Sequence, residues 1–172
     1  MRGMVQLYTG ENKGKTTAAA GLALRALGNG MRVLFVQFMK SVFSGEVEML
    51  KRCGGERIAV LRKWDDSFII GPPGANQIAL AESLWDETMA RMESFAPDLL
   101  VLDEIAVALR YGLLKENRVL KFLKERPENL EVVMTGQGAS QALIDASDLV
   151  TEMCKIKHYY DKGVMARKGI EY

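Results

Sequence analysis

Near the start of the chain stands the stretch Thr9-Gly10-Glu11-Asn12-Lys13-Gly14-Lys15-Thr16-Thr17. An apolar run, Met4 to Tyr8, precedes it, and an alanine-rich stretch of helical character follows it. A strand, a glycine-rich turn, Lys-Thr and a helix, in that order, are the setting of a phosphate-binding loop. The usual pattern has a glycine five residues before the Gly-Lys-Thr glycine. Here that position is Thr9, and the nearest earlier glycine is Gly10. We therefore predict a phosphate loop that is one residue short between its glycines.

The residue types of this loop suit a polyphosphate. Backbone N–H groups converge on phosphate oxygens, and the helix N-terminus adds a partial positive charge. Lys15 brings a positive charge to the phosphates, and the Thr16 hydroxyl is a ligand for Mg²⁺. The alternative is a glycine turn that only starts a helix. The predicted ATP-binding residues of the loop are Gly10, Glu11, Asn12, Lys13, Gly14, Lys15, Thr16 and Thr17.

A second signal is Leu99-Leu100-Val101-Leu102-Asp103-Glu104. An acidic residue at the end of an apolar strand is the usual metal-side partner of a phosphate loop. Any buried strand can end in Asp-Glu, so the signal gains weight only from the loop. We predict Thr16, Asp103 and Glu104 as metal ligands, and Lys15, Thr16 and Glu104 as the catalytic residues.

Apolar runs alternate with helical patterns along the chain, which predicts strands joined by helical crossovers. Strands are expected at residues 4–9, 32–38, 58–61, 99–103, 131–135 and 149–155, and helices at 15–27, 46–52, 75–95, 116–125 and 140–146, with Ser140 as a cap. A loop is expected at 64–74 and a polar tail from 158. This order favours a single α/β domain spanning 1–172: a three-layer parallel sheet with helices on both faces, the RecA-like phosphate-loop NTPase architecture. Its ligands would lie at the carboxyl ends of the strands.

Composition narrows the class of protein. The chain has 172 residues, with 23 Lys and Arg against 22 Asp and Glu, so charge gives no reason to expect nucleic acid or a membrane as partner. No apolar run approaches the about 18 residues of a membrane span. The first strand begins so early that we expect no signal peptide. Two cysteines without metal-ligand spacing fit a reduced, cytoplasmic protein.

The nucleotide and the reaction remain open on the residues alone. The Asn-Lys-x-Asp motif of GTPases is absent, which favours ATP over GTP. Residues 52–63 carry three arginines but no compact kinase lid, and the chain is short for a helicase. A generic phosphate-loop ATPase, a small-molecule kinase and a non-enzymatic nucleotide-binding module are the alternatives.

Five segments resemble the ATP:corrinoid adenosyltransferases of cobalamin synthesis and salvage. They are residues 9–19, Val36-Gln37-Phe38-Met39-Lys40, Val101-Leu102-Asp103-Glu104, Thr135-Gly136-Gln137-Gly138, and the tail, residues 156–172. The likeness runs nearly end to end and is closest in the tail, which generic phosphate-loop enzymes do not share.

The resemblance implies a reaction in which Co(I) of a reduced corrinoid attacks C5′ of ATP and triphosphate leaves. It implies Mg²⁺ or Mn²⁺, a homodimer, a reducing flavoprotein as electron donor, and ATP lying reversed along the loop. By motif position it adds Arg25 to the ATP-binding residues, and it places Lys40 and Glu46 at the edge of the active site.

The chain departs from that family before the long helix. Enterobacterial members carry Phe-Thr-Trp there, to displace the lower ligand of the corrinoid, whereas this chain has Ser67 and Ile69 where those aromatic residues fall. Trp64 and Phe68 are the nearby aromatic residues, and we predict them as corrinoid contacts. The alternative for this segment is a loop packed on the core.

Overall fold

The computed structural model describes residues 2–40, 44–65, 69 and 71–171, and its centre is a six-stranded sheet. The strands are β1 (Val5–Thr9), β2 (Val33–Gln37), β3 (Ile58–Arg62), β4 (Leu99–Asp103), β5 (Glu131–Thr135) and β6 (Leu149–Glu152). The helices are α1 (Lys15–Gly28), α2 (Gly45–Gly54), α3 (Ala75–Phe95), α4 (Ile105–Arg110), α5 (Glu116–Glu125) and α6 (Gln141–Asp145), with 3-10 turns η1 (Gly55–Arg57) and η2 (Tyr159–Lys162). The strand order is β3-β2-β4-β5-β1-β6, and every pair is parallel.

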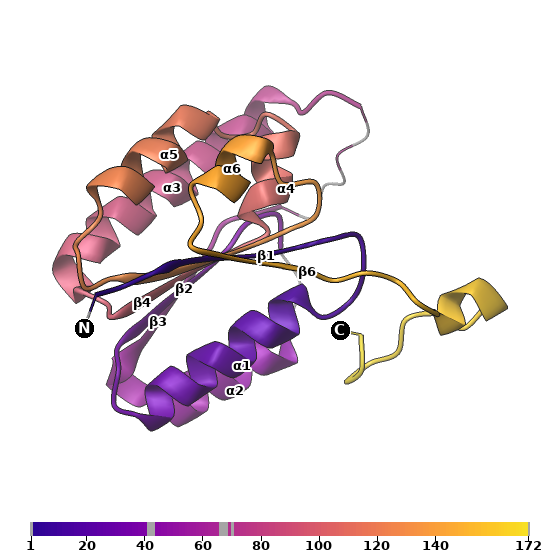
Figure 1. Ribbon diagram of the computed structural model, residues 1–172, viewed down its shortest axis with the longest axis horizontal. Helices are drawn as coiled ribbons and strands as arrows, with labels where there is room; N and C mark the ends of the chain where they lie inside the picture. The colour runs from indigo at the N-terminus through magenta and orange to yellow at the C-terminus, as the bar shows by residue number, and fades with distance from the viewer. Residues whose placement is uncertain (1, 41–43, 66–68, 70, 172) are drawn as a thin grey trace.

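Helices cover both faces of this sheet. In Figure 1, α1 and α2 lie below the strands, while α3, α4, α5 and α6 lie above them. Crossover helices on both sides are what parallel strands require, because each strand must be followed by a return across the sheet. The predicted three-layer α/β architecture is therefore confirmed.

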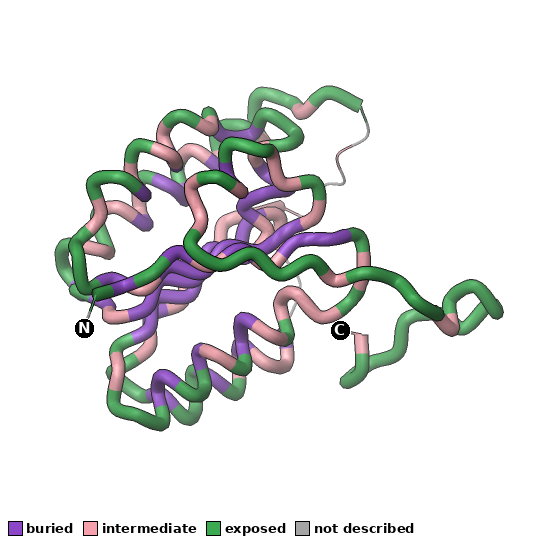
Figure 2. The backbone as a smooth tube through the Cα atoms, viewed as in Figure 1, coloured by how far each residue is buried: buried purple, intermediate pink, exposed green. Residues whose placement is uncertain are grey.

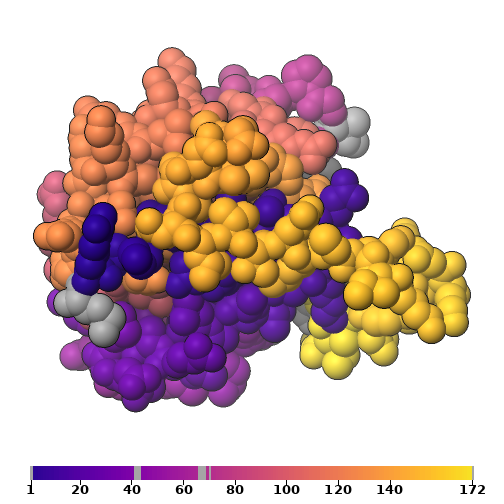
Figure 3. Space-filling view, viewed as in Figure 1, coloured from indigo at the N-terminus to yellow at the C-terminus, as the bar shows by residue number. Residues whose placement is uncertain are grey.

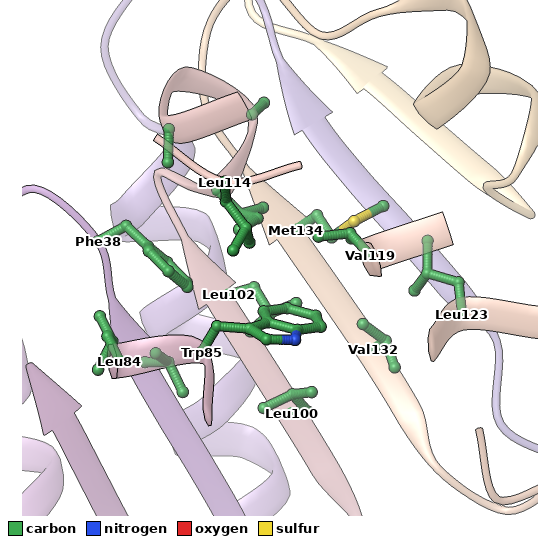
Figure 4. Packing of buried hydrophobic residues seen from close by; sticks show 14 of the residues in the cluster. Phe38, Leu84, Trp85, Leu100, Leu102, Leu114, Val119, Leu123, Val132 and Met134 are labelled. Carbon is green, nitrogen blue, oxygen red and sulfur yellow. The ribbon is translucent and has the colours of Figure 1, made fainter. Parts of the chain in front are cut away.

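The hydrophobic core is divided by the sheet, because successive strand residues point to opposite faces. In β4, Leu99 and Val101 join the cluster under α1 and α2, whereas Leu100 and Leu102 join the cluster under α3, α4 and α5. Figure 4 shows the second cluster, in which Trp85 of α3 lies among Leu100, Leu102 and residues of α5. The central strands β2 and β4 are buried along their length, whereas β6 is exposed throughout (Figure 2).

The strand order decides which residues meet at the carboxyl edge. β5 lies between β1, which carries the glycine loop, and β4, which ends at Asp103. The last residue of β5, Thr135, is therefore the neighbour of both. This arrangement agrees with the RecA-like phosphate-loop architecture expected from the sequence.

Most element bounds agree with the sequence prediction, and the differences have local causes. Ser140 caps α6 as expected, accepting a hydrogen bond from the Leu143 N–H at 3.2 Å. α4 was not expected, since it starts directly after β4 at Glu104, without a glycine or proline to mark the turn. β6 ends three residues early, because its last backbone bond to β1 runs from the Met153 N–H to the Thr9 carbonyl and the chain then leaves the sheet. Among the described residues no helix is both long and apolar enough to cross a membrane.

Candidate functional site

The glycine loop leaves β1 and turns sharply before α1. Gly10 and Gly14 have φ of 96° and 119°, in the left-handed region that favours glycine. A side chain at Gly10 would meet the backbone N and O of Met153 at 2.6 Å, and one at Gly14 would meet the Met153 sulfur at 3.0 Å. Met153, directly after β6, therefore fixes the loop, and the two glycines are required by both backbone angle and space.

Lys15 lies at the start of α1 with its ammonium folded into the loop. Its Nζ donates to the Gly10 carbonyl and to the Asn12 carbonyl, each at 2.7 Å. Burial lowers the pKa of Lys15, while the charges of Glu104 and Asp103 oppose that shift. The nearby carboxylates thus act against the effect of partial desolvation on this predicted phosphate-binding lysine.

Asp103 is the buried centre of the polar cluster at the carboxyl edge. Its side chain is fully buried and accepts four hydrogen bonds. Oδ1 accepts from the hydroxyls of Thr16 at 2.9 Å and Thr135 at 2.7 Å; Oδ2 accepts from Lys40 Nζ at 2.6 Å and from Gln37 Nε2 at 3.2 Å. A carboxylate with all four lone-pair positions engaged is held in one orientation. Residues from α1, β2, β5 and the segment after β2 meet on this one carboxylate.

Glu104 adds a second carboxylate in an unusual backbone conformation. Its φ is 62°, which is uncommon for a residue with a side chain and costs free energy unless neighbours enforce it. The enforcing contact is a hydrogen bond from its N–H to the Thr135 hydroxyl at 2.9 Å. Burial, with the charge of Asp103, raises the pKa of Glu104, and Lys40 and Lys15 act against that rise.

The oxygen atoms of this cluster fit a hard divalent cation. The Thr16 hydroxyl and the Asp103 carboxylate lie 2.9 Å apart, and the Lys40 ammonium lies against both, at 3.1 and 2.6 Å. The positive charge of Lys40 therefore lies beside two of the predicted metal ligands, Thr16 and Asp103. No cluster of three or more His, Cys, Asp or Glu side chains suited to a metal occurs in the described part of the chain. Mg²⁺ is commonly held by one or two carboxylates plus substrate phosphates.

A cavity of about 470 Å³ opens over the loop. It brings together predicted phosphate-binding and metal-binding residues, the segment after β2, the start of α2, and the C-terminal tail. Its walls are Asn12, Lys13, Gly14, Lys15, Thr16, Thr17, Lys40, Gly45, Glu46, Glu104, Gly169, Ile170 and Glu171. Lys40 and Glu46, which the resemblance placed at the edge of the site, both line it.

The tail reaches back to the loop through Lys13. Lys13 Nζ donates to the Ile170 carbonyl at 2.8 Å, to the Glu171 carboxylate at 2.9 Å and to the Tyr159 hydroxyl at 3.4 Å. Arg167, Tyr159 and Lys13 together hold the pKa of Glu171 well below its usual range. The loop cation is therefore paired with a tail carboxylate at the mouth of the cavity.

Other predicted site residues lie away from this cavity. Arg25 is exposed near the C-terminal end of α1, about 15 Å along the helix axis from Lys15 at the usual rise per residue. Trp64 packs against the core cluster of α3 rather than lining the cavity. Gly10 and Glu11 belong to the stem of the loop, outside the cavity wall. Phe68 lies outside the described residues. The roles of these residues in binding stay predictions.

Sequence reasoning assigned no role to Gln37, Thr135 or Glu171. A signal existed for Gln37, a polar residue in an otherwise apolar buried strand, and for Thr135, the polar end of another. Their meeting at Asp103 depends on strand order, which the sequence pattern leaves open. Glu171 had no local signal, since its partner lies 158 residues away.

Comparison with known proteins agrees with this geometry. The model of the family described as ATP:corrinoid adenosyltransferase BtuR/CobO/CobP matches residues 1–172. A corrinoid adenosyltransferase of Pseudomonas aeruginosa is 36% identical over 171 residues, covering 99% of this chain and 84% of that protein. Corrinoid adenosyltransferases of Escherichia coli and Salmonella typhimurium are each 34% identical over 174 residues, covering 99% of this chain and 86% of those proteins. The chain belongs to the family of ATP:corrinoid adenosyltransferases.

Proposed function

We propose that this protein transfers the 5′-deoxyadenosyl group of ATP to Co(I) of a reduced corrinoid and releases triphosphate. The observation that carries the proposal is the cavity over the loop, where Lys13, Lys15, Thr16 and the Glu104 carboxylate face one space. The Asp103 carboxylate is buried next to this cavity and accepts a hydrogen bond from Thr16. Membership of the adenosyltransferase family supplies the reaction type. A single nucleotide-binding domain, residues 1–172, would contain the whole ATP site.

The proposed reaction needs no general acid or general base from the protein. The Co(I) electron pair forms the cobalt–carbon bond to C5′ while the C5′–oxygen bond breaks. That bond's electrons leave on triphosphate, and cobalt becomes formally Co(III). Because the metal centre of the substrate is itself the nucleophile, the protein needs only to orient C5′ and to stabilise the leaving group.

The loop side chains suit a leaving group that gains negative charge. Preorganised cations and backbone N–H groups stabilise charge that develops in the transition state without reorganising at that moment. Lys15 and the amides of the α1 N-terminus would hold the triphosphate, and Lys13 would join them once it leaves Glu171. Thr16, Asp103 and Glu104 would hold Mg²⁺ or Mn²⁺, whose charge offsets that of the phosphates.

The proposal also includes a homodimer and an electron donor for the corrinoid. Family likeness suggests a homodimer, and the exposed edge strand β6, with Leu149 and Val150 both more than 40% exposed, offers surface for a second copy. A reduced flavoprotein would supply the electron that makes Co(I). Cys53 and Cys154 are both exposed free thiols, which suits a reducing cytoplasm.

A generic ATPase or small-molecule kinase is the alternative, and its products differ. Either of these enzymes cleaves between phosphates and yields ADP, whereas adenosyl transfer leaves all three phosphates joined. Neither alternative accounts for family membership over the whole chain.

The test is adenosyl transfer by the wild-type protein and by Lys15→Ala. With ATP, Mg²⁺ and chemically reduced corrinoid, the absorbance change of cobalt–carbon bond formation should appear with the wild type. We expect Lys15→Ala to lose at least about a hundredfold in rate, the usual effect of removing a group that stabilises transition-state charge. Lys51→Ala is the matched control, because Lys51 is paired with Glu48 on the surface of α2, outside the cavity. Full activity of Lys15→Ala, with its circular dichroism unchanged, would overturn the role given to the loop.

A further inference from the structure

The Lys40 side chain stands at the predicted metal position. Its ammonium is 2.6 Å from Asp103 Oδ2 and 3.1 Å from Thr16 Oγ1, two of the three predicted ligand side chains. It is the cation paired with a fully buried carboxylate, and its own side chain remains 29% exposed toward the cavity. Lys40 is thus both a counter-charge to Asp103 and part of the cavity wall.

The backbone around Lys40 directs it to this place. β2 pairs with β4 so that Gln37 lies beside Asp103, and the Phe38 N–H extends the pairing by donating to the Asp103 carbonyl at 3.0 Å. Met39 then adopts a φ of 55°, in the left-handed region, which turns the chain before Lys40. A conformation that is costly for methionine and lies next to a site residue indicates a position fixed by the surrounding fold.

An ammonium and a divalent metal cannot share these oxygen atoms. Mg²⁺ binds oxygen at about 2.0–2.1 Å in a nearly ideal octahedron, and the Lys40 ammonium occupies the approach to Thr16 and Asp103. Metal binding therefore requires Lys40 to leave. Four carbons of flexible side chain give it reach, and the cavity that it already lines is where anionic phosphate would lie.

We propose that Lys40 is a further triphosphate-binding residue, which neutralises Asp103 while the site is empty and moves onto the phosphates when metal and nucleotide enter. The positive charge is then never lost from the site: the metal replaces the ammonium at Asp103, and the ammonium adds to the charge on the leaving group. The identity of the polyphosphate rests on the proposed function; the exchange of lysine for metal does not.

The exchange is tested by binding alone, without corrinoid. Free Mn²⁺ is titrated by electron paramagnetic resonance into nucleotide-free wild type, Lys40→Met and Lys51→Met. Because Lys40→Met has no ammonium to displace, it should bind Mn²⁺ several times more tightly than the wild type. Lys51→Met should match the wild type, since the Lys51 ammonium pairs with Glu48 on the surface and does not line the cavity.

Binding of Mn²⁺ with inorganic triphosphate gives the opposite expectation. A charge-assisted hydrogen bond to phosphate is lost in Lys40→Met, so affinity for triphosphate should fall about tenfold or more. Tighter metal binding together with weaker triphosphate binding supports the proposal. Unchanged or weaker Mn²⁺ binding, or unchanged triphosphate binding, overturns it.

A second variant and readouts that do not depend on catalysis complete the test. Lys40→Met leaves Asp103 without a cation, so Lys40→Gln, which can still donate to that carboxylate, replaces it if the first variant does not fold. The readouts are also independent of adenosyl transfer. If the binding shifts appear while the wild type forms no cobalt–carbon bond, the proposed function fails and the role of Lys40 stands.

Discussion

Gly10 lies against the backbone of Met153, and this contact explains why residue 10 is a glycine. A Cβ there would lie 2.6 Å from both the N and the O of Met153, and the φ of 96° disfavours any side chain. The glycine at position 10 is matched to a specific neighbour, Met153, directly after β6. The conformation of the loop therefore depends on its contact with the edge of the sheet.

We expect Gly10→Ala to be strongly destabilising. The left-handed backbone alone costs about 1–3 kcal/mol for a residue with a side chain, and the contact with Met153 adds to it because backbone atoms cannot rotate away. Urea unfolding measures the change. Gly21→Ala is the control: Gly21 lies within α1 with no atom near an added Cβ, so alanine should stabilise by about 0.5–1 kcal/mol. Equal effects of the two changes would contradict this account of the loop.

Elements contribute to the site through their neighbours in the sheet. Thr135 meets Asp103 because β5 lies between β1 and β4, and it receives the Glu104 N–H because α4 begins without an intervening loop. One hydroxyl thereby holds both the Asp103 carboxylate and the backbone of Glu104. Its loss should act on the metal as well as on the fold.

Thr135→Val tests that dual role. The change keeps the shape and removes both hydrogen bonds, so it should destabilise by about 1–3 kcal/mol, the usual effect of leaving buried polar groups unpaired. Mn²⁺ affinity, measured by electron paramagnetic resonance, should fall at the same time. Thr88→Val is the matched control, since Thr88 is equally buried but donates to the Leu84 carbonyl within α3. It should cost stability and leave Mn²⁺ binding unchanged; a loss of Mn²⁺ affinity in both variants would remove the special role of Thr135.

The sequence predicted the helices and strands well, but it predicted the contacts between residues of different strands less well. The loop, the buried strands and the long helix follow from glycine placement and hydrophobic pattern, which are local properties. Strand order is not local, so the contacts of Gln37 and Thr135 with Asp103 could not be foreseen. The left-handed conformations of Met39 and Glu104, which aim Lys40 and start α4, occur at residue types that give no warning of them.

At the level of the whole molecule, the C-terminal tail contacts the glycine loop near the start of the chain. Figure 3 shows the tail projecting from one side of the molecule, beyond the end of β6, and Figure 1 shows its end returning to the region before α1. Most tail residues are exposed, but Glu171 has only 15% of its side chain exposed, because it contacts Lys13, Tyr159 and Arg167. This carboxylate, together with the Ile170 carbonyl and the Tyr159 hydroxyl, connects the tail to Lys13 at the cavity.

Glu171→Gln should release the tail from the loop. The neutral amide keeps the size but loses the charge that Arg167, Tyr159 and Lys13 stabilise, so the tail should be cut faster by trypsin at its lysines and arginines. Glu152→Gln, a change of the same kind at an exposed position of β6, is the control. Equal cleavage of the tail in wild type and Glu171→Gln would show that the carboxylate does not hold it.

The tail contact should also depend on pH in one direction. The pKa of Glu171 is depressed in the folded protein from an ordinary value of 4.5. The stabilisation from the Glu171 carboxylate is therefore fully present above its pKa in the unfolded chain. It is lost as pH falls through the lower pKa of Glu171 in the folded protein. Protection of the tail from a protease should be constant from neutral pH down to that ordinary value, and a loss of protection between neutral pH and mildly acidic pH would contradict the assignment.

The inorganic product of the reaction shows whether the protein holds triphosphate as a leaving group. Wild-type protein is incubated with ATP, Mg²⁺ and reduced corrinoid, and the phosphorus nuclear magnetic resonance spectrum is compared with the cobalt–carbon absorbance change. We expect one intact triphosphate for each cobalt–carbon bond, and neither product without corrinoid. ADP and phosphate as the products, formed whether or not corrinoid is present, would contradict it.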